Sequence, residues 1–456
     1  MIAWKRPRPA RRCRSLTGAL PLLVLPLLAL PLLLLPAGPA AAQVTAGYSI
    51  EFDLPSFPFK KAMNARFRPE LNALKARMSQ RQAAGDNVTC SLQIYREAHW
   101  LVNYTPDAER AQARIAALEK SLEQKDQSWA LEQTDTDGSW GACYDAWFFR
   151  LQVSVDPLKR LMAEGKTPQY PLDFMKPVND PAKLTALLDE LLVSDIDSGE
   201  ANRRRELNMV VTALGQLLFL PDLSAMLPAD YPVEQMATTL RNYMDDPWQN
   251  QMTGYWGAWY IQKGELIKTD DLSLTFHIIS YRRGDVKMLD TLVDTTFSLR
   301  ETKYPYGWQD RGTTNNHHNY DVATILKYGW PEMDYLQQAR ATAEIAIMLA
   351  RSLRLTMDGK GRYYTEAYDN VGDAYYFGVS FLDVVGYFDP SKRFWAPRMK
   401  FAEAHSLKIR LLKNLEDLHS EDPMVQLALQ KLRAEPDFDD DDEVHVHGKA
   451  GAHAAD

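Results

Sequence analysis

The chain has 456 residues, of which 46% are hydrophobic, and its formal net charge is −8. This length and hydrophobic content are sufficient for a large buried core. The acidic balance, and the lack of a basic block in the body of the chain, argue against nucleic acid as a partner.

The first 42 residues have the pattern of an export signal. Six lysines and arginines precede a leucine-rich run, which ends in Ala40, Ala41 and Ala42. A run of this length is also compatible with a transmembrane anchor, but its internal prolines and small-residue end favour cleavage. We expect residues 1–42 to be a cleaved signal peptide. The mature protein is then expected to be periplasmic or secreted, with no stable membrane association.

Two cysteines, Cys90 and Cys143, remain after removal of the signal. In an oxidising compartment two such cysteines can form a disulfide, and we predict this bridge; two separate buried thiols are the alternative. Neither cysteine has a neighbouring histidine, which argues against a zinc site. No spacing of His, Asp or Glu in the body of the chain indicates a metal, so we expect neither metal nor cofactor.

Residues 43–436 have a helical periodicity. The segment 181–195 places Leu184, Leu187, Leu188 and Leu191 on one stripe, and several later segments of similar length repeat this pattern. Prolines fall mostly between the segments, and strand alternation is scarce; residues 357–369 form the one predicted hairpin. We therefore predict an all-α fold, an α/α toroid in which helical hairpins form an incomplete barrel, with a few short hairpins in loops. The acidic residues 437–456 are predicted to be a disordered tail.

Tryptophan and tyrosine cluster with amides and charged groups in residues 245–264 and 303–312. A pyranose ring packs its flat face on an aromatic ring, and its hydroxyls need many fixed hydrogen-bond partners. Helix packing is the alternative explanation for any single cluster. We predict a sugar-binding cleft, and the candidate substrate-binding residues are Asn250, Gln251, Tyr255, Trp256, Trp259, Tyr306, Trp308 and Asn315.

Two motifs carry a family resemblance. The sequence GYWGAW (254–259), followed by HHNYDVATIL (317–326), resembles the paired signatures of the alginate lyase family, and the related chondroitin and hyaluronan lyases share its toroid. The resemblance covers residues 245–355. It implies a polysaccharide lyase in which Tyr320, within His318-Asn319-Tyr320, acts as base and acid. The family's Asn-Asn-His aligns with Gln251-Met252-Thr253, so its helix histidine is absent here. Arg311 is the nearest arginine, at a different offset.

Elimination chemistry explains why such residues would gather. A lyase removes the C5 proton of a uronic acid and expels the C4 oxygen, so an amide or a protonated histidine must hold the neighbouring carboxylate. A tyrosine base needs its pKa lowered from about 10. On a helix that starts near Asn316, Asn316 and His317 share the face of Tyr320, whereas His318 points about 160° away. The helix geometry therefore favours His317, and the motif favours His318.

The sequence leaves two other functions open. A glycoside hydrolase on the same scaffold would need two carboxylates beside a cleft, and Asp310, Asp321, Glu265 and Glu366 are available for this. A non-catalytic glycan-binding protein is the second alternative, because the family's helix histidine is missing. We expect a lyase that acts on an anionic, uronic-acid-containing polysaccharide.

Overall fold

A computed structural model describes residues 56–309, 314–368, 370–420 and 422–436. The predicted signal peptide, the predicted tail, Asp310 and Arg311 lie outside these residues. The described chain is mostly helical, which confirms the predicted all-α class. Among the described residues, no helix combines the length and the apolar character needed to cross a membrane.

The longer helices are α1 (Pro58–Ala83), α2 (Thr89–Tyr104), α3 (Ala108–Ser121), α4 (Trp147–Ala163), α5 (Pro181–Leu192), α6 (Arg204–Phe219), α8 (Val233–Tyr243), α9 (Leu272–Tyr281), α10 (Leu289–Ser298), α11 (Asn316–Gly329), α12 (Tyr335–Leu355), α13 (Val371–Val384), α14 (Ala404–Asp417) and α15 (Pro423–Ala434). The shorter ones are α7 (Pro221–Ser224), η1 (Ser128–Leu131), η2 (Asp173–Val178), η3 (Met244–Trp248), η5 (Trp330–Glu332) and η6 (Pro390–Lys392).

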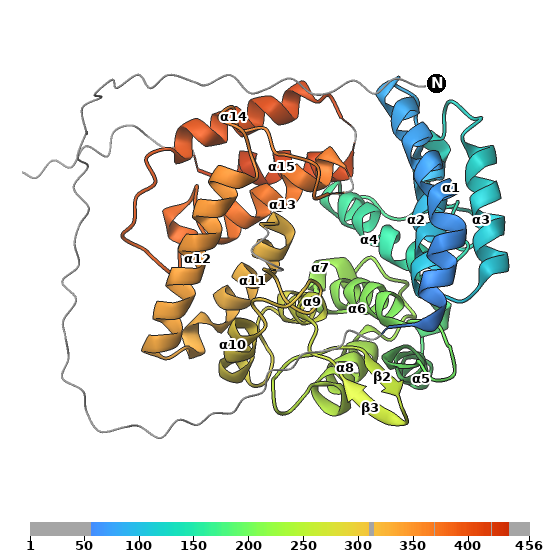
Figure 1. Ribbon diagram of the computed structural model, residues 1–456, viewed down its shortest axis with the longest axis horizontal. Helices are drawn as coiled ribbons and strands as arrows, with labels where there is room; N and C mark the ends of the chain where they lie inside the picture. Colours follow the sequence, from blue (N-terminus) through green and yellow to red (C-terminus); the bar gives the residue numbers. More distant parts are fainter. Residues whose placement is uncertain (1–55, 310–313, 369, 421, 437–456) are drawn as a thin grey trace, which may run out of the picture. The chain divides into compact units, whose positions relative to one another are not determined.

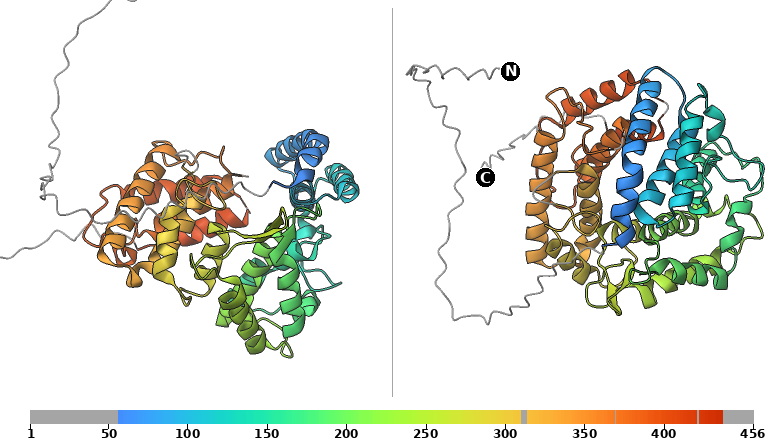
Figure 2. Two further views of the ribbon diagram at one scale, coloured as in Figure 1. Left: turned by 60° about the horizontal axis from the view of Figure 1, so that its bottom comes forward. Right: turned by 45° about the vertical axis from the view of Figure 1, so that its right-hand side comes forward.

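The helices pack as two rows. In the first row α4, α6, α9, α11, α13 and α15 each contact the next member. Helices α5 and α8 contact α6, α10 and α12 contact α11, and α14 contacts α15. Helices α1, α2 and α3 pack against one another, as the right view of Figure 2 shows. Successive helices along the chain alternate between the first row and the helices that pack against it. Residues that are far apart in the sequence therefore come together on the first row.

Local sequence explains individual helices. In α5 the side chains of Leu184, Leu188 and Leu191 are buried, as the apolar spacing predicted. Asp180 caps the helix, because its carboxylate accepts hydrogen bonds from the backbone N–H groups of Ala182 (2.9 Å) and Lys183 (3.2 Å). Leu187, predicted on the same stripe, is only partly buried.

A small sheet was not predicted. Strand β1 (Val193–Asp195) pairs in parallel with β2 (Trp259–Gln262), which pairs antiparallel with β3 (Glu265–Lys268). The β2–β3 turn holds Lys263 and Gly264 at positive φ, and both backbone N–H groups donate to the Asp197 carboxylate at 2.9 Å. Within the predicted hairpin at 357–369, an antiparallel bridge joins Met357 and Tyr363, and the Tyr364 backbone N–H donates to the Thr356 carbonyl at 2.9 Å, so a short hairpin is present.

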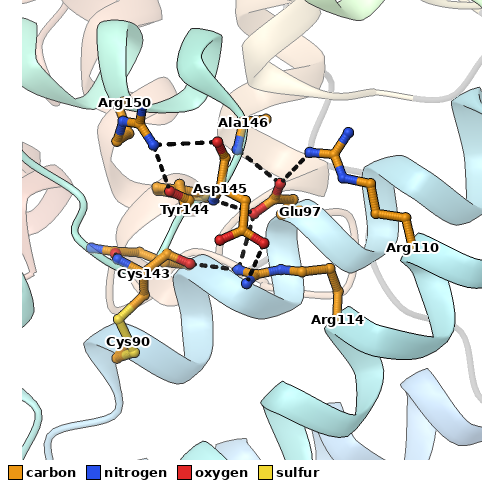
Figure 3. A network of polar contacts seen from close by, with 10 residues as sticks. Cys90, Glu97, Arg110, Arg114, Cys143, Tyr144, Asp145, Ala146 and Arg150 are labelled. Carbon is orange, nitrogen blue, oxygen red and sulfur yellow. Dashed lines mark hydrogen bonds and ion pairs between the residues drawn. A yellow bond between two sulfur atoms is a disulfide. The ribbon is translucent and has the colours of Figure 1, made fainter. Parts of the chain in front are cut away.

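The predicted disulfide is present between Cys90, in the first turn of α2, and Cys143, in the loop before α4. A buried carboxylate supports the same loop (Figure 3). Glu97 of α2 accepts hydrogen bonds from the backbone N–H groups of Asp145 and Ala146, both at 2.9 Å. It also forms ion pairs with Arg110 (3.1 Å) and Arg114 (3.0 Å) of α3. Glu97 therefore joins α2, α3 and the loop that enters α4.

Candidate functional site

The start of α11 holds the polar stretch that the sequence singled out. The Asn315 side chain caps the helix by accepting a hydrogen bond from the His317 backbone N–H at 2.9 Å. Asn316 is fully buried, and its amide donates to Thr356 Oγ1 at 2.9 Å. Its backbone N–H donates to Tyr368 Oη at 3.0 Å. Its full burial argues against the catalytic role predicted for Asn316, because this amide fixes the beginning of the helix.

His317 contacts a tyrosine from the preceding segment. Tyr304 Oη lies 3.3 Å from His317 Nε2 and donates a hydrogen bond to Asp321 Oδ2 at 3.2 Å. His317 and Asp321 are one turn apart on α11, so one hydroxyl reaches both. The His317 ring stacks on Phe377 of α13, and the His318 ring stacks on Tyr304, each with centroids 4.0 Å apart. The stacked rings fix the orientation of both imidazoles.

The same tyrosine is linked to two further helices. The Ser273 side chain of α9 acts on the Tyr304 hydroxyl, because it lowers the pKa of Tyr304 against the larger, opposite effect of burial. Ser273 Oγ lies 3.5 Å from the amide nitrogen of Asn208 on α6. Asn208 Oδ1 is buried and has no hydrogen-bond partner among the described residues. We call Asn208, Ser273, Tyr304, His317 and Asp321 the Tyr304 cluster. It assembles an amide, two hydroxyls, an imidazole and a carboxyl group from three helices and a loop.

An arginine lies one turn before Asn208 on α6. Arg204 pairs with Asp271 through two hydrogen bonds, from Nε at 2.6 Å and from Nη2 at 2.9 Å. Asp271 also caps α9 by accepting a hydrogen bond from the Leu274 backbone N–H at 3.0 Å. This ion pair fixes α6 against α9, the two helices that carry Asn208 and Ser273.

Polar rings continue beyond the cluster along α9. Ser273, His277 and Tyr281 are spaced by four residues and share one face of the helix. Tyr281 Oη lies 3.3 Å from His277 Nδ1. The Tyr281 ring packs against Gly215 of α6, where a Cβ would lie 3.1 Å from the ring. Phe276 packs edge-on against Tyr320 of α11, with ring centroids 5.2 Å apart.

Burial determines the protonation of these groups. It lowers the pKa of His317 to about 3, with a smaller contribution from His318, and lowers the pKa of His318 to about 4. Both imidazoles are therefore neutral at neutral pH, which favours an amide over a protonated histidine, the two groups that were expected to hold the carboxylate. Burial raises the pKa of Tyr320 well above its usual value, whereas the expected mechanism needed it lowered. Burial likewise raises the pKa of the Asp321 carboxyl.

Three of the predicted sugar-binding aromatics are core residues. Tyr255 and Trp256 are fully buried, and Trp308 is 1% exposed. Tyr255 Oη is hydrogen-bonded to Thr296 Oγ1 at 2.8 Å, and the indole N–H groups of Trp256 and Trp308 donate to backbone carbonyls. No sugar can cover these rings, so their assignment to substrate binding is wrong.

The other predicted binding residues are partly or fully exposed. Trp259 lies in β2, with Lys268 Nζ 3.9 Å from its ring centroid. Tyr306 Oη lies 3.4 Å from Tyr260 Oη. Asn250 fixes a turn, because its oxygen accepts from the Met252 N–H at 3.0 Å. Gln251 is exposed. Within the described parts of the chain, no hydrogen bond or ring contact joins Asn250, Gln251 or Trp259 to the Tyr304 cluster.

Sequence reasoning found His317 but missed most of its partners. Asn208, Ser273 and Tyr304 are far apart in the chain, and no single motif contains them. The four-residue spacing of Ser273, His277 and Tyr281 was visible in the sequence and marked a polar helix face. In the part of the chain that the structure describes, no group of three or more His, Cys, Asp or Glu is placed to hold a metal ion. Comparisons with protein-family models, curated proteins and solved structures found no match.

Proposed function

We propose that this protein is an exported polysaccharide lyase that cleaves a uronic-acid-containing polymer by β-elimination. The observation that carries the proposal is the 3.3 Å separation between a neutral imidazole nitrogen, His317 Nε2, and the hydroxyl of Tyr304. Both residues are only partly buried; the His317 side chain is 30% exposed. A base and an acid within hydrogen-bond distance are what the reaction requires.

The proton transfers of this reaction balance within the pair. In the tautomer that leaves His317 Nε2 without a hydrogen, this nitrogen takes the C5 proton, and the electron pair expels the C4 oxygen with formation of the C4–C5 double bond. Tyr304 gives its proton to the leaving oxygen, because burial keeps the pKa of its hydroxyl well above the usual value and the group is protonated beforehand. The imidazolium then returns a proton to Tyr304. Neither group has to exchange a proton with solvent during the cycle.

The carboxylate beside C5 must be stabilised while the proton is removed. Asn208 supports this role through its amide N–H₂ group, whose one hydrogen bond within the described chain is the weak 3.5 Å contact with Ser273 Oγ. Arg204, one turn away, adds positive charge near the cluster, partly neutralised by Asp271. In this proposal Asn208 and Arg204 of α6 take the role in holding the carboxylate that the sequence suggested for Asn316 and a protonated histidine.

We further propose that the two rows of helices form an α/α toroid. The support is the alternation of successive helices between the rows, and the placement of the Tyr304 cluster on α6, α9 and α11 of one row. The hydrolase alternative is less well supported: Asp321 is fully buried, Glu265 is exposed at the start of β3, and Glu366 is exposed on a turn. Non-catalytic glycan binding remains a competitor, which the following experiment separates from both enzymes.

The test is a panel of polyuronates and neutral glycans, assayed in parallel for ultraviolet absorbance and for reducing ends. A lyase produces both signals with a polyuronate, because elimination leaves a conjugated double bond. Reducing ends without absorbance would indicate hydrolysis, and binding without either signal would indicate a silent glycan-binding protein. Tyr320→Phe, made alongside, should keep activity close to that of the unaltered protein if Tyr304 is the acid. Loss of activity in Tyr320→Phe would return the acid role to the residue favoured by the family motif.

A further inference from the structure

A cavity of about 570 Å³ lies at a different place, between the turn at 357–363 and helix α14. Its lining residues are Gly359, Lys360, Arg362, Tyr375, Arg410, Lys413, Asn414, Asp417 and Leu418. Four of these side chains are cationic and one is anionic. Such an excess of positive charge is unusual on a chain whose net charge is −8. The cavity therefore offers local attraction for an anion.

Most of this positive charge has no ion-pair partner in the part of the chain that the structure describes. Arg362 pairs with Asp358 at 2.8 Å. Within the described chain, by contrast, Lys360, Lys413 and Arg410 form no ion pair, and the buried Nε of Arg410 has no hydrogen-bond partner. An N–H group that is buried without a partner costs free energy, which a bound acceptor would recover. Three cations and one unsatisfied donor thus point to the same ligand property, a negatively charged oxygen.

The walls of the cavity are held in place by the protein itself. The Asp358 carboxylate accepts hydrogen bonds from the backbone N–H groups of Lys360 and Arg362, both at 2.9 Å. Asn414 of α14 donates to the Lys360 carbonyl at 3.0 Å. The Tyr363 ring packs against Gly378 of α13, where any Cβ would lie 2.2 Å from the ring. The turn therefore presents Lys360 to α14 in a fixed position.

One wall is apolar. Leu418 is exposed there, and the largely buried Tyr375 of α13 lies behind the cavity and offers little surface of its own. A simple inorganic anion gains nothing from contact with an apolar wall, whereas the apolar face of a sugar ring can pack against it. The volume is also far larger than a single anion requires and lies in the range of small-molecule sites.

We propose that this basic cavity binds the carboxylates of an oligouronate and serves as a second, non-catalytic site for the polymer. The inference rests on the proposed function for its choice of glycan. It adds a binding surface that is separate from the Tyr304 cluster, because none of the cavity's lining residues belongs to that cluster. A second site raises the effective concentration of a long polymer at the first one.

The test is calorimetric titration of a four-residue oligouronate into the full chain carrying His317→Ala, in which the probe is not cleaved. We expect a binding event that weakens with added salt and is at least tenfold weaker with the additional change Lys413→Glu. Lys360→Glu should act in the same way, and both side chains are exposed, so the fold is retained. The matched control is Lys120→Glu on α3, which does not line the cavity and should leave the affinity unchanged.

Three results would overturn the inference. The first is equal affinity with and without Lys413→Glu, and the second is equal binding of a neutral tetrasaccharide. The third is complete displacement of the probe by an equal concentration of inorganic phosphate, which would make the cavity a general anion site. Cleavage by the unaltered protein is measured separately. If cleavage fails while Lys413→Glu still abolishes a binding event, the enzyme proposal falls and the cavity inference stands. If the unaltered protein cleaves the polymer while Lys413→Glu leaves binding unchanged, the enzyme proposal stands and the cavity inference falls.

Discussion

Tyr304→Phe is the substitution that examines the candidate site most directly. It keeps the aromatic ring and its stacking on His318, and removes only the hydroxyl. That hydroxyl lies 3.3 Å from His317 Nε2 and 3.2 Å from Asp321 Oδ2. If Tyr304 is the acid of an elimination, the variant lacks the proton that this mechanism gives to the leaving oxygen. Turnover should then fall by about 10²–10⁴-fold, the contribution of a general acid–base catalyst.

The same substitution also carries a cost in stability that can be estimated. Asp321 is fully buried, and its Oδ1 already has no hydrogen-bond partner among the described residues. Loss of the Tyr304 hydroxyl would leave Oδ2 without one as well. An unsatisfied buried polar group costs about 1–3 kcal/mol, so the free energy of unfolding should fall by that order. Urea unfolding measures this loss, and initial rates with a polyuronate measure turnover.

Tyr306→Phe is the matched control, because it removes a hydroxyl from the same segment. Among the described residues the Tyr306 hydroxyl has only a 3.4 Å contact with Tyr260 Oη, so turnover should stay close to that of the unaltered protein and stability should change by less than about 0.5 kcal/mol. Near-normal turnover in a folded Tyr304→Phe protein would refute the assignment and leave Tyr304 a structural role. Equal losses in both variants would show that the effect does not depend on the proton of Tyr304.

Two further predictions concern stability. Burial raises the folded-state pKa of Asp321 above its ordinary value of 3.8, so this carboxyl stabilises the fold below that pH and loses the contribution as the pH rises through the raised pKa. Asp321→Asn should therefore gain unfolding free energy relative to the unaltered protein as the pH increases above 3.8; a difference that is independent of pH in urea titrations would contradict this. The double change Cys90→Ser and Cys143→Ser opens a bridge across 53 residues and should cost about 2–4 kcal/mol. An unchanged thermal midpoint would show that the disulfide contributes little.

The sequence predicted the helices well because their apolar spacing directly reflects which face is buried, as in α5. It did not predict the β2–β3 hairpin, whose turn uses Lys263 and Gly264 at positive φ and lacks the usual Asn-Gly pair. The hairpin expected at 357–369 is short among the described residues: an antiparallel bridge joins Met357 and Tyr363 around the turn that follows Asp358. Turn chemistry is thus a weaker guide in this chain than helical periodicity.

The site could be predicted only in part. His317 stood out because polar residues are dense around it, but density does not distinguish exposed groups from buried ones. The burial of Asn316 was missed for this reason, and so was that of Trp256 and Trp308. Asn208 and Tyr304 escaped notice because their proximity depends on the packing of α6, α9 and α11, which no local pattern encodes. Even the protonation of His317 follows from burial, a property of the folded chain.

The Glu97 carboxylate limits which substitutions a redesign of this protein can make in α2. Its two oxygens receive two backbone N–H groups and two guanidinium groups, so all four approaching groups bring hydrogens. A glutamine here would turn two more N–H hydrogens toward those donors, and an aspartate is one methylene too short to reach them. Libraries that vary α2, α3 or the loop entering α4 should therefore hold position 97 constant, and a graft of this helical corner onto another scaffold has to carry Arg110 and Arg114 with it.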